Sequence, residues 1–298
     1  DDSEAPSKCS QAMKAFSATR SVPFTRQLRA KSRRAPKRVC AAANEVLPEE
    51  EEEGLVSPGV ALASEPDRLA GLRVSVAGAT GGTGKLVVEA LVRRGATVKC
   101  LVRDLEKARK TLPPEAVLVE GDVFQFSTLR GFIDSDADAV ICCTGCRPSA
   151  DPLGPFNVDF QGTQNLVAAA EQTGSVKRFV LVTSIGVDDI FFPLNLAWGV
   201  LFWKKRAEEA LQRSGVPYTI VRPGGLTNDE QPGEVVMAKP DTYGLPPRSR
   251  PGSVGRATVA EVCVEALSLA DAENKVVELV CSDSAPPSTL QALFAAVP

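Results

Sequence analysis

The chain has 298 residues, of which 44% are hydrophobic and 24% charged, and its net charge is −3. This length and composition suit one α/β core with an additional segment, and no apolar run reaches the roughly 18 residues that a membrane span needs. Histidine is absent, which excludes Ser-His and Cys-His nucleophile pairs and histidine-based zinc sites. We expect no metal site.

The first 40 residues have the composition of an organelle leader. From Lys8 to Asn44 there are ten Lys or Arg residues and no Asp or Glu, with Ser and Thr interspersed. This pattern is typical of a chloroplast transit peptide, and Met13 is a natural start for it. The alternative is a disordered basic tail for nucleic acid or membrane.

The remainder of the chain is acidic. Residues 1–40 hold ten of the 34 Lys and Arg residues and three of the 37 Asp and Glu residues, so residues 41–298 carry a net charge near −10. That charge does not fit nucleic-acid binding. Residues 41–68 include the run Glu49–Glu53 and three prolines, and we expect a solvated linker there because little apolar surface is available to bury.

From residue 69 onward, short β-branched runs alternate with helical patterns, which predicts a single α/β domain over 69–298. Its sheet is expected to be parallel and doubly wound, of the Rossmann type, because several strands are apolar throughout. The expected strands are 72–77, 97–102, 116–119, 138–143, 178–183, 217–222 and 275–280. The expected helices are 83–94, 104–111, 126–133, 157–173, 196–214, 256–270 and a short one at 288–296.

A glycine-rich turn joins the first strand to the first helix. The candidate phosphate-binding residues are Gly78, Thr80, Gly81, Gly82, Thr83 and Gly84. Glycines at this spacing allow a tight turn, a close approach of the backbone to phosphate and close helix packing, while the helix N-terminus offers N–H groups and a positive dipole end. A β-α-β frame surrounds the motif, so we predict a dinucleotide site.

Ligands of such sheets lie beyond the carboxyl ends of the strands. Arg103 and Asp104 follow the second strand. An arginine there can pair with a 2′-phosphate, which favours NADP over NAD. Alternatively, Arg103 is a solvated loop charge and Asp104 only caps the next helix.

Two further strand ends supply candidate cofactor-binding residues. Asp122 and Val123 could contact the adenine, although a turn aspartate that caps the following helix is an equal alternative. Thr144 and Gly145 are small enough to lie against the nicotinamide ribose. The CxxC at 143–146 has a redox interpretation, but its first cysteine is expected to be a buried strand residue, so we expect a structural role.

These motifs together resemble the atypical short-chain dehydrogenase/reductase family, NAD(P)-binding and NmrA-like. The resemblance rests on Val76–Gly84, Leu101–Asp104, Gly121–Asp122, Val182–Ser184 and Tyr218–Gly225. Within the family it is closest to chloroplast members, such as the dehydrogenase-like subunit of the inner-envelope translocon. It covers roughly residues 70–290, implies a bound nicotinamide dinucleotide and adds Pro223 to the cofactor-binding residues.

Catalysis in this family uses a serine after the fifth strand and a tyrosine four residues before a lysine. Ser184 matches the serine and Lys204 the lysine, which would also hold the nicotinamide ribose. The tyrosine position then falls on Val200, or on Leu201 if Lys205 is the counterpart of the lysine. The chain's two tyrosines, Tyr218 and Tyr243, lack a lysine four residues later, so the usual proton donor is missing.

An apolar, aromatic stretch, Ile190–Trp203, stands where the tyrosine would be, followed by the basic trio Lys204–Arg206. It could dock a membrane surface or a hydrophobic partner, line a pocket for an apolar substrate, or pack as a buried helix on the sheet.

Two functions therefore remain open. The chain is either a redox-responsive or assembly protein of the chloroplast that binds NADP(H) without standard chemistry, or an NADPH-dependent oxidoreductase acting on a small apolar carbonyl metabolite. The expected location is the stroma or the periphery of a thylakoid or envelope membrane.

Overall fold

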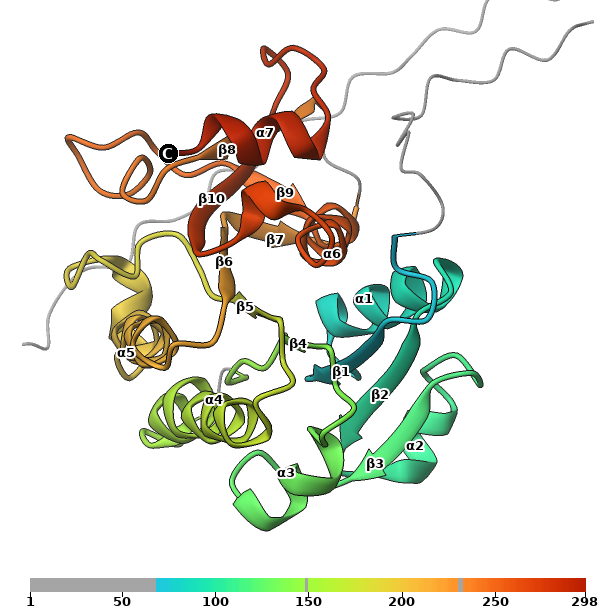
Figure 1. The fold of residues 1–298 in the computed structure, drawn as a ribbon. Helices are drawn as coiled ribbons and strands as arrows, with labels where there is room; N and C mark the ends of the chain where they lie inside the picture. The colour runs from blue at the N-terminus through green and yellow to red at the C-terminus, as the bar shows by residue number, and fades with distance from the viewer. Residues whose placement is uncertain (1–67, 148–149, 230–232) are drawn as a thin grey trace, which may run out of the picture. The chain divides into compact units, whose positions relative to one another are not determined.

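The computed structural model describes residues 68–147, 150–229 and 233–298 (Figure 1). The expected leader at 1–40, and all but the last residue of the expected linker at 41–68, lie outside the described residues. No helix in the described part of the chain is long and apolar enough to cross a membrane.

The core of the described residues is an eight-stranded sheet with the order β3-β2-β1-β4-β5-β6-β10-β8. Every neighbouring pair is parallel except β10 and β8. This confirms the predicted Rossmann-type doubly wound sheet. The strands are β1 (Arg73–Ala77), β2 (Thr97–Val102), β3 (Val117–Glu120), β4 (Ala139–Cys142), β5 (Arg178–Val182), β6 (Tyr218–Pro223), β8 (Glu234–Ala238) and β10 (Lys275–Ser282).

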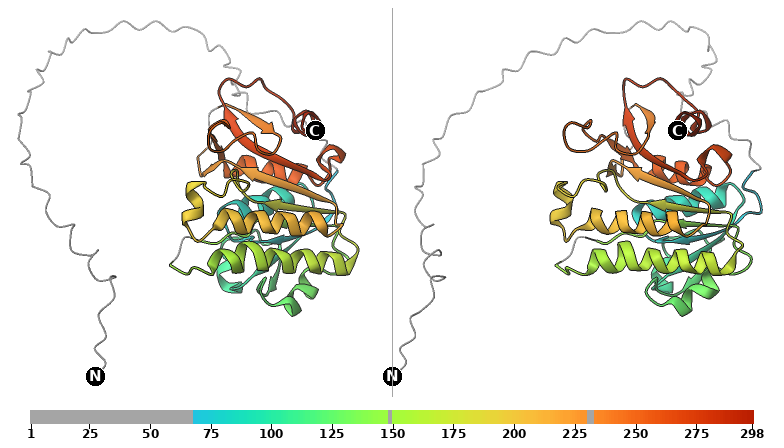
Figure 2. Two further views of the ribbon diagram at one scale, coloured as in Figure 1. Left: turned by 90° about the vertical axis from the view of Figure 1, so that its left-hand side faces the viewer. Right: turned by 60° about the vertical axis from the view of Figure 1, so that its left-hand side comes forward.

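Helices cover both faces of the sheet (Figure 2). One face packs against α1 (Gly82–Arg93), α2 (Leu105–Arg109), α6 (Arg256–Glu265) and α7 (Leu290–Ala296), and the other against α3 (Phe126–Phe132), α4 (Gly162–Thr173) and α5 (Val200–Arg213). The apolar strands are buried from both sides, as a parallel sheet requires. The strand order reverses between β1 and β4, which places a crevice at their carboxyl ends.

The structure differs from the sequence prediction where backbone geometry interrupts a periodic pattern. The helix expected at 157–173 begins as a π-helical turn, η1 (Phe156–Gln161), before α4. The helix expected at 196–214 starts only at Val200, after the 3₁₀ turn η2 (Pro193–Leu196), because Trp198 and Gly199 have positive φ angles of 56° and 69°.

Three short strands were not predicted. Besides β8, a separate pair forms from β7 (Gly225–Thr227) and β9 (Ser253–Gly255), which lie parallel. This pair leads directly into α6. The helix expected at 256–270 ends at Glu265 and is followed by the 3₁₀ turn η3 (Ala270–Ala272).

Candidate dinucleotide site

The loop between β1 and α1 depends on glycines whose missing Cβ atoms permit close backbone contacts. Gly78 has a φ of +77°, and a Cβ there would lie 2.7 Å from the carbonyl carbon of Cys143 and 2.8 Å from the amide nitrogen of Thr144. A Cβ on Gly84 would lie 2.1 Å from the carbonyl oxygen of Gly78. The start of α1 is therefore held closely against the ends of β1 and β4.

The first turn of α1 offers backbone N–H groups to an anion. Its N-cap, Gly81, makes no side-chain hydrogen bond, and the turn contains no acidic residue. Gly82 and Thr83 are among the first helical residues, whose N–H groups have no partner within the helix. Thr80 and Gly82 are exposed, whereas Thr83 and Gly84 are buried. This cradle fits the diphosphate of a dinucleotide.

At the end of β4, a buried ion pair fixes Lys204 beside Gly145. Lys204 Nζ lies 2.7 Å from Oδ1 of Asp159, whose side chain is fully buried. Asp159 Oδ2 accepts a hydrogen bond from the N–H of Cys146 at 3.2 Å. Lys204 Nζ would lie 3.8 Å from a Cβ on Gly145, and Thr144 accompanies it at the same strand end. The structure thus holds Lys204 beside Gly145, just after the end of β4, and its contact with the nicotinamide ribose stays a prediction.

Ser184 lies two residues after the end of β5, the strand that pairs with β4. Its Oγ donates to the carbonyl of Ile185 at 3.1 Å, and the N–H of Ile185 donates to the carbonyl of Pro223 at 3.0 Å. Ser184 is therefore fixed against the end of β6 by its own loop, while Lys204 is fixed by Asp159. Ser184 comes from the loop after β5, whereas Lys204 comes from α5 and places its Nζ beside Gly145, after the end of the adjacent strand β4.

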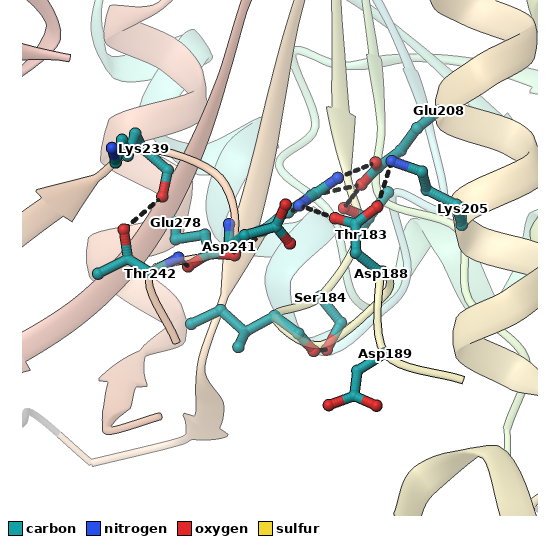
Figure 3. Close-up of polar contacts among 12 residues, drawn as sticks. Thr183, Ser184, Asp188, Asp189, Lys205, Glu208, Lys239, Asp241, Thr242 and Glu278 are labelled. Atoms are coloured by element: carbon teal, nitrogen blue, oxygen red, sulfur yellow. Dashed lines mark hydrogen bonds and ion pairs between the residues drawn. The ribbon is translucent and has the colours of Figure 1, made fainter. Parts of the chain in front are cut away.

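A network of buried charges anchors α5 and the loop after Ser184 to the sheet (Figure 3). Arg222, on β6, donates to Glu208 at 2.6 and 3.0 Å and to Asp188 at 2.5 Å. Thr183 donates to Glu208 at 2.6 Å, and Lys205 pairs with Asp188. The helix that carries Lys204 is thus attached to the strand end that carries Ser184.

These partners set the ionisation of the network. Burial alone would lower the pKa of Arg222, but hydrogen bonds and charges from Glu208 and Asp188 outweigh it and raise that pKa. Burial opposes ionisation of Asp188, yet Lys205 and Arg222 hold its pKa below the usual value. Burial and the nearby charge of Asp188 raise the pKa of Asp241.

The ends of β2 and β3 hold the residues expected near the adenosine. Arg103 is exposed, and Asp104 caps α2 by accepting from the N–H of Lys107 at 3.0 Å, as the alternative interpretation of Asp104 expected. Asp122 accepts from the N–H of Phe124 at 3.1 Å, so it also stabilises its own turn. Val123 packs against α4, where a Cβ on Gly162 would lie 2.6 Å from its Cγ2.

The aromatic stretch lies at the surface for much of its length. Its exposed side chains, with their exposed fractions, are Ile190 (66%), Phe191 (86%), Leu194 (51%), Leu196 (89%), Trp198 (50%) and Phe202 (42%). Burial as a helix on the sheet therefore does not describe this segment. Trp203 is an exception, because its ring packs edge-on against Phe156 of η1, with ring centroids 4.9 Å apart.

The CxxC cysteines lack the environment of a reactive thiol. Burial raises the pKa of Cys143 well above its ordinary value, with further contributions from Cys263 and Cys142. Burial and the nearby carboxylates of Asp159 and Asp151 also raise the pKa of Cys146. A nucleophilic thiolate requires the opposite shift.

Comparison with known proteins assigns the fold and its cradle to a family. Residues 78–269, from the first glycine of the loop to the end of the segment after α6, match the model of a family described as NAD(P)H-binding. The chain belongs to this family. It is an atypical short-chain dehydrogenase/reductase, as its motifs suggested, and nicotinamide dinucleotide binding is its family property.

Several curated relatives of this chain are described as chloroplastic. An uncharacterized chloroplastic protein of Arabidopsis thaliana is 45% identical over 237 residues, which cover 76% of this chain and 82% of that protein. Protein TIC 62, chloroplastic, of Oryza sativa subsp. japonica is 36% identical over 240 residues. That match covers 72% of this chain and 47% of the rice protein, so the chain spans about half of that relative.

Among solved structures, one from Bacillus halodurans described as an NAD-dependent epimerase/dehydratase has a TM-score of 0.64 and 26% sequence identity. The match covers 76% of this chain and 99% of the Bacillus halodurans chain. The chloroplastic relatives support the chloroplast as the location of this protein.

Sequence reasoning missed three residues of the site: Asp159, Glu208 and Arg256. Asp159 and Glu208 are acids within helical patterns, which resemble solvated helix positions until the fold buries them. Arg256 comes from the far end of the chain and lies against Gly82. The one local signal available was an acid between apolar residues, such as Asp159 between Val158 and Phe160.

Proposed function

We propose that this chain is an NADP(H)-binding chloroplast protein in which cofactor occupancy controls docking of the exposed segment Ile190–Trp203 to a membrane-bound complex. The observation that carries the proposal is the position of this segment in the chain, between Ser184 and Lys204. The exposed segment begins six residues after Ser184 and ends directly before Lys204, so it joins the two residues expected to flank the nicotinamide.

Packing links the segment to the site at both ends. Next to Ser184, Gly186 has a φ of +85°, and a Cβ there would lie 2.8 Å from Cδ2 of Phe192. At the other end, Trp203 packs on η1, the turn that carries Asp159. A shift of Lys204 or Ser184 on nucleotide binding would therefore move the base of the exposed segment.

The exposed segment itself has the chemistry of a docking surface. Large apolar side chains gathered on one exposed stretch mark interaction sites, and the sequence provides no standard YxxxK proton donor that would require the region for catalysis. The chloroplastic relatives, Protein TIC 62 among them, are consistent with a partner in the chloroplast.

The preference for NADP rests on the end of β2. Asp104 is engaged in capping α2, which reduces its capacity to accept from the ribose 2′-OH of NAD. Arg103 is exposed, and no hydrogen bond or ion pair joins it to another described residue. Its guanidinium is therefore available for a 2′-phosphate.

Membrane co-sedimentation tests the proposal. The full chain is mixed with isolated thylakoid or envelope membranes without nucleotide, with NADPH and with NADP+, and we expect the bound fraction to differ between these conditions. The double variant Phe191→Ser, Leu196→Ser should lose membrane binding while its Kd for NADPH stays unchanged. Equal sedimentation under all conditions, or by the variant, would contradict the proposal.

A second candidate function is supported by the buried Asp159–Lys204 pair. A lysine paired with a buried carboxylate beside Gly145, with Ser184 after the adjacent strand β5, suits an NADPH-dependent reductase of a small apolar carbonyl compound. NADPH oxidation across a carbonyl panel tests it. Saturable turnover that falls in Ser184→Ala would favour this function over docking alone.

A further inference from the structure

Arg256 lies at the glycine loop although it is distant in sequence. It is the first residue of α6, and a Cβ on Gly82 would lie 2.9 Å from its Nε and 3.0 Å from its Cδ. Gly82 is the first residue of α1. The arginine therefore lies against one side of Gly82, the residue that opens the phosphate cradle, and the missing side chain of Gly82 gives it room.

The helices α1 and α6 lie side by side (Figure 1). Gly82 and Arg256 join their first residues, while farther along α1 the ion pair Arg94–Glu265 joins the two helices at 2.7 Å. β7 begins two residues after the carboxyl end of β6, and β9 pairs with β7. Because α6 begins directly after β9, its first residue is held at the carboxyl edge of the sheet. This is the edge where the crevice lies.

The position of this arginine is electrostatically unfavourable without an anion. A helix N-terminus carries a partial positive charge of about half a unit, which favours anions and disfavours cations. Arg256 lies at one such terminus and beside another, and neither helix has an acidic first-turn residue or a side-chain cap.

Among the described residues, the hydrogen-bond partners of Arg256 are uncharged. Within the described residues, its Nη1 donates to Asn228 Oδ1 at 2.8 Å and weakly to the Leu226 carbonyl at 3.5 Å, and both acceptors are uncharged. No hydrogen bond or ion pair with a described residue involves its Nε or Nη2. As far as the described residues go, the N–H groups of Nε and Nη2 therefore remain for a ligand at the cradle.

We propose that Arg256 contacts the diphosphate of the bound dinucleotide and closes the cradle from the α6 side. The inference rests on the proposed nucleotide binding at the glycine loop. A guanidinium can donate two parallel hydrogen bonds to phosphate oxygens. Because NADPH and NADH share the diphosphate, Arg256 contributes equally to both, whereas Arg103 distinguishes them.

Nucleotide affinities of the full chain test the inference. Arg256→Ala should raise the Kd for NADPH and for NADH by the same factor, about 10- to 100-fold, which is typical of a lost hydrogen bond to a charged group. Arg256→Lys keeps the charge and should recover part of the affinity. Lys85→Ala removes an exposed cation from the same end of α1 and should change either Kd less than about 3-fold, since exposed charges are screened.

A structural role for Arg256 predicts a different pattern. Asn228→Ala removes the hydrogen bond between Arg256 and the loop after β7 but keeps the guanidinium. It should therefore leave the Kd values for NADPH and NADH within about 3-fold of the wild type. Loss of affinity in Asn228→Ala equal to that in Arg256→Ala, with a matching fall in Tm, would overturn the inference.

The remaining outcomes separate the inference from the proposed function. Unchanged affinity of Arg256→Ala, in a chain whose wild type binds NADPH, would overturn the inference alone. A loss restricted to NADPH would assign the arginine to the 2′-phosphate and would also overturn it. A wild-type chain that binds neither nucleotide would overturn both the inference and the proposed function.

Discussion

Replacing Gly78 by alanine introduces two destabilising effects, backbone strain at a positive φ and steric overlap with the residues after β4. Gly78 has a φ of +77°, and a Cβ there would lie 2.7–2.8 Å from backbone atoms of Cys143 and Thr144. Gly215 has nearly the same φ, +76°, with nothing within 4 Å of a Cβ. Gly215→Ala therefore measures the left-handed strain alone, whereas Gly78→Ala adds the collision with β4.

The magnitudes follow from these geometries. An alanine in the left-handed region costs about 1–2 kcal/mol, and overpacking a closed backbone contact costs about 1–3 kcal/mol more. We expect Gly215→Ala to lower the free energy of unfolding by about 1–2 kcal/mol and Gly78→Ala by about 2–5 kcal/mol.

Urea unfolding of both variants and the wild type measures these values, with unchanged m-values as the check on two-state behaviour. Gly78→Ala should also bind NADPH more weakly, because the strain is relieved by moving the end of β4, whereas Gly215→Ala should bind normally. Equal destabilisation by the two substitutions would refute the close contact between Gly78 and the end of β4.

Three further predictions concern charges. Arg103→Ala should weaken NADPH binding at least about 10-fold more than NADH binding, and equal weakening of the two Kd values would contradict a 2′-phosphate role. Glu208→Leu leaves Arg222 buried with one carboxylate fewer, so unfolding should become easier by about 3 kcal/mol; a loss below about 1 kcal/mol in urea unfolding would show that the pair is dispensable. Asp241 has a raised pKa in the folded chain because of burial and Asp188, so its ionisation opposes folding as the pH rises above the ordinary carboxyl pKa of about 3.9. Asp241→Asn should therefore gain stability relative to the wild type at pH 7 and lose that gain near pH 4, and the reverse order in urea unfolding would contradict this.

Local patterns predicted the parts of the fold that local chemistry determines. The glycine loop, the alternation of strands and helices and the Asp104 cap all depend on neighbours in sequence, and the structure contains each of them. The positive φ angles of Trp198 and Gly199 have no comparable sequence signal. The predicted helix therefore began too early.

Long-range contacts explain most of what the sequence could not provide. Asp159 and Lys204 meet only when η1 packs on α5, and Arg256 reaches Gly82 only when α6 packs on α1. The segment Ile190–Trp203 was ambiguous for another reason. Apolar composition is the same for a core helix and a docking surface, and only the tertiary structure shows which side chains are covered.

Tryptophan fluorescence offers the most direct test of coupling between the nucleotide site and the exposed segment. The chain's two tryptophans, Trp198 and Trp203, both lie in this segment. Titration of the full chain with NADP+ should change their emission saturably, and NADPH should in addition quench it by energy transfer. Emission that stays unchanged at saturating concentrations of both nucleotides would contradict this coupling.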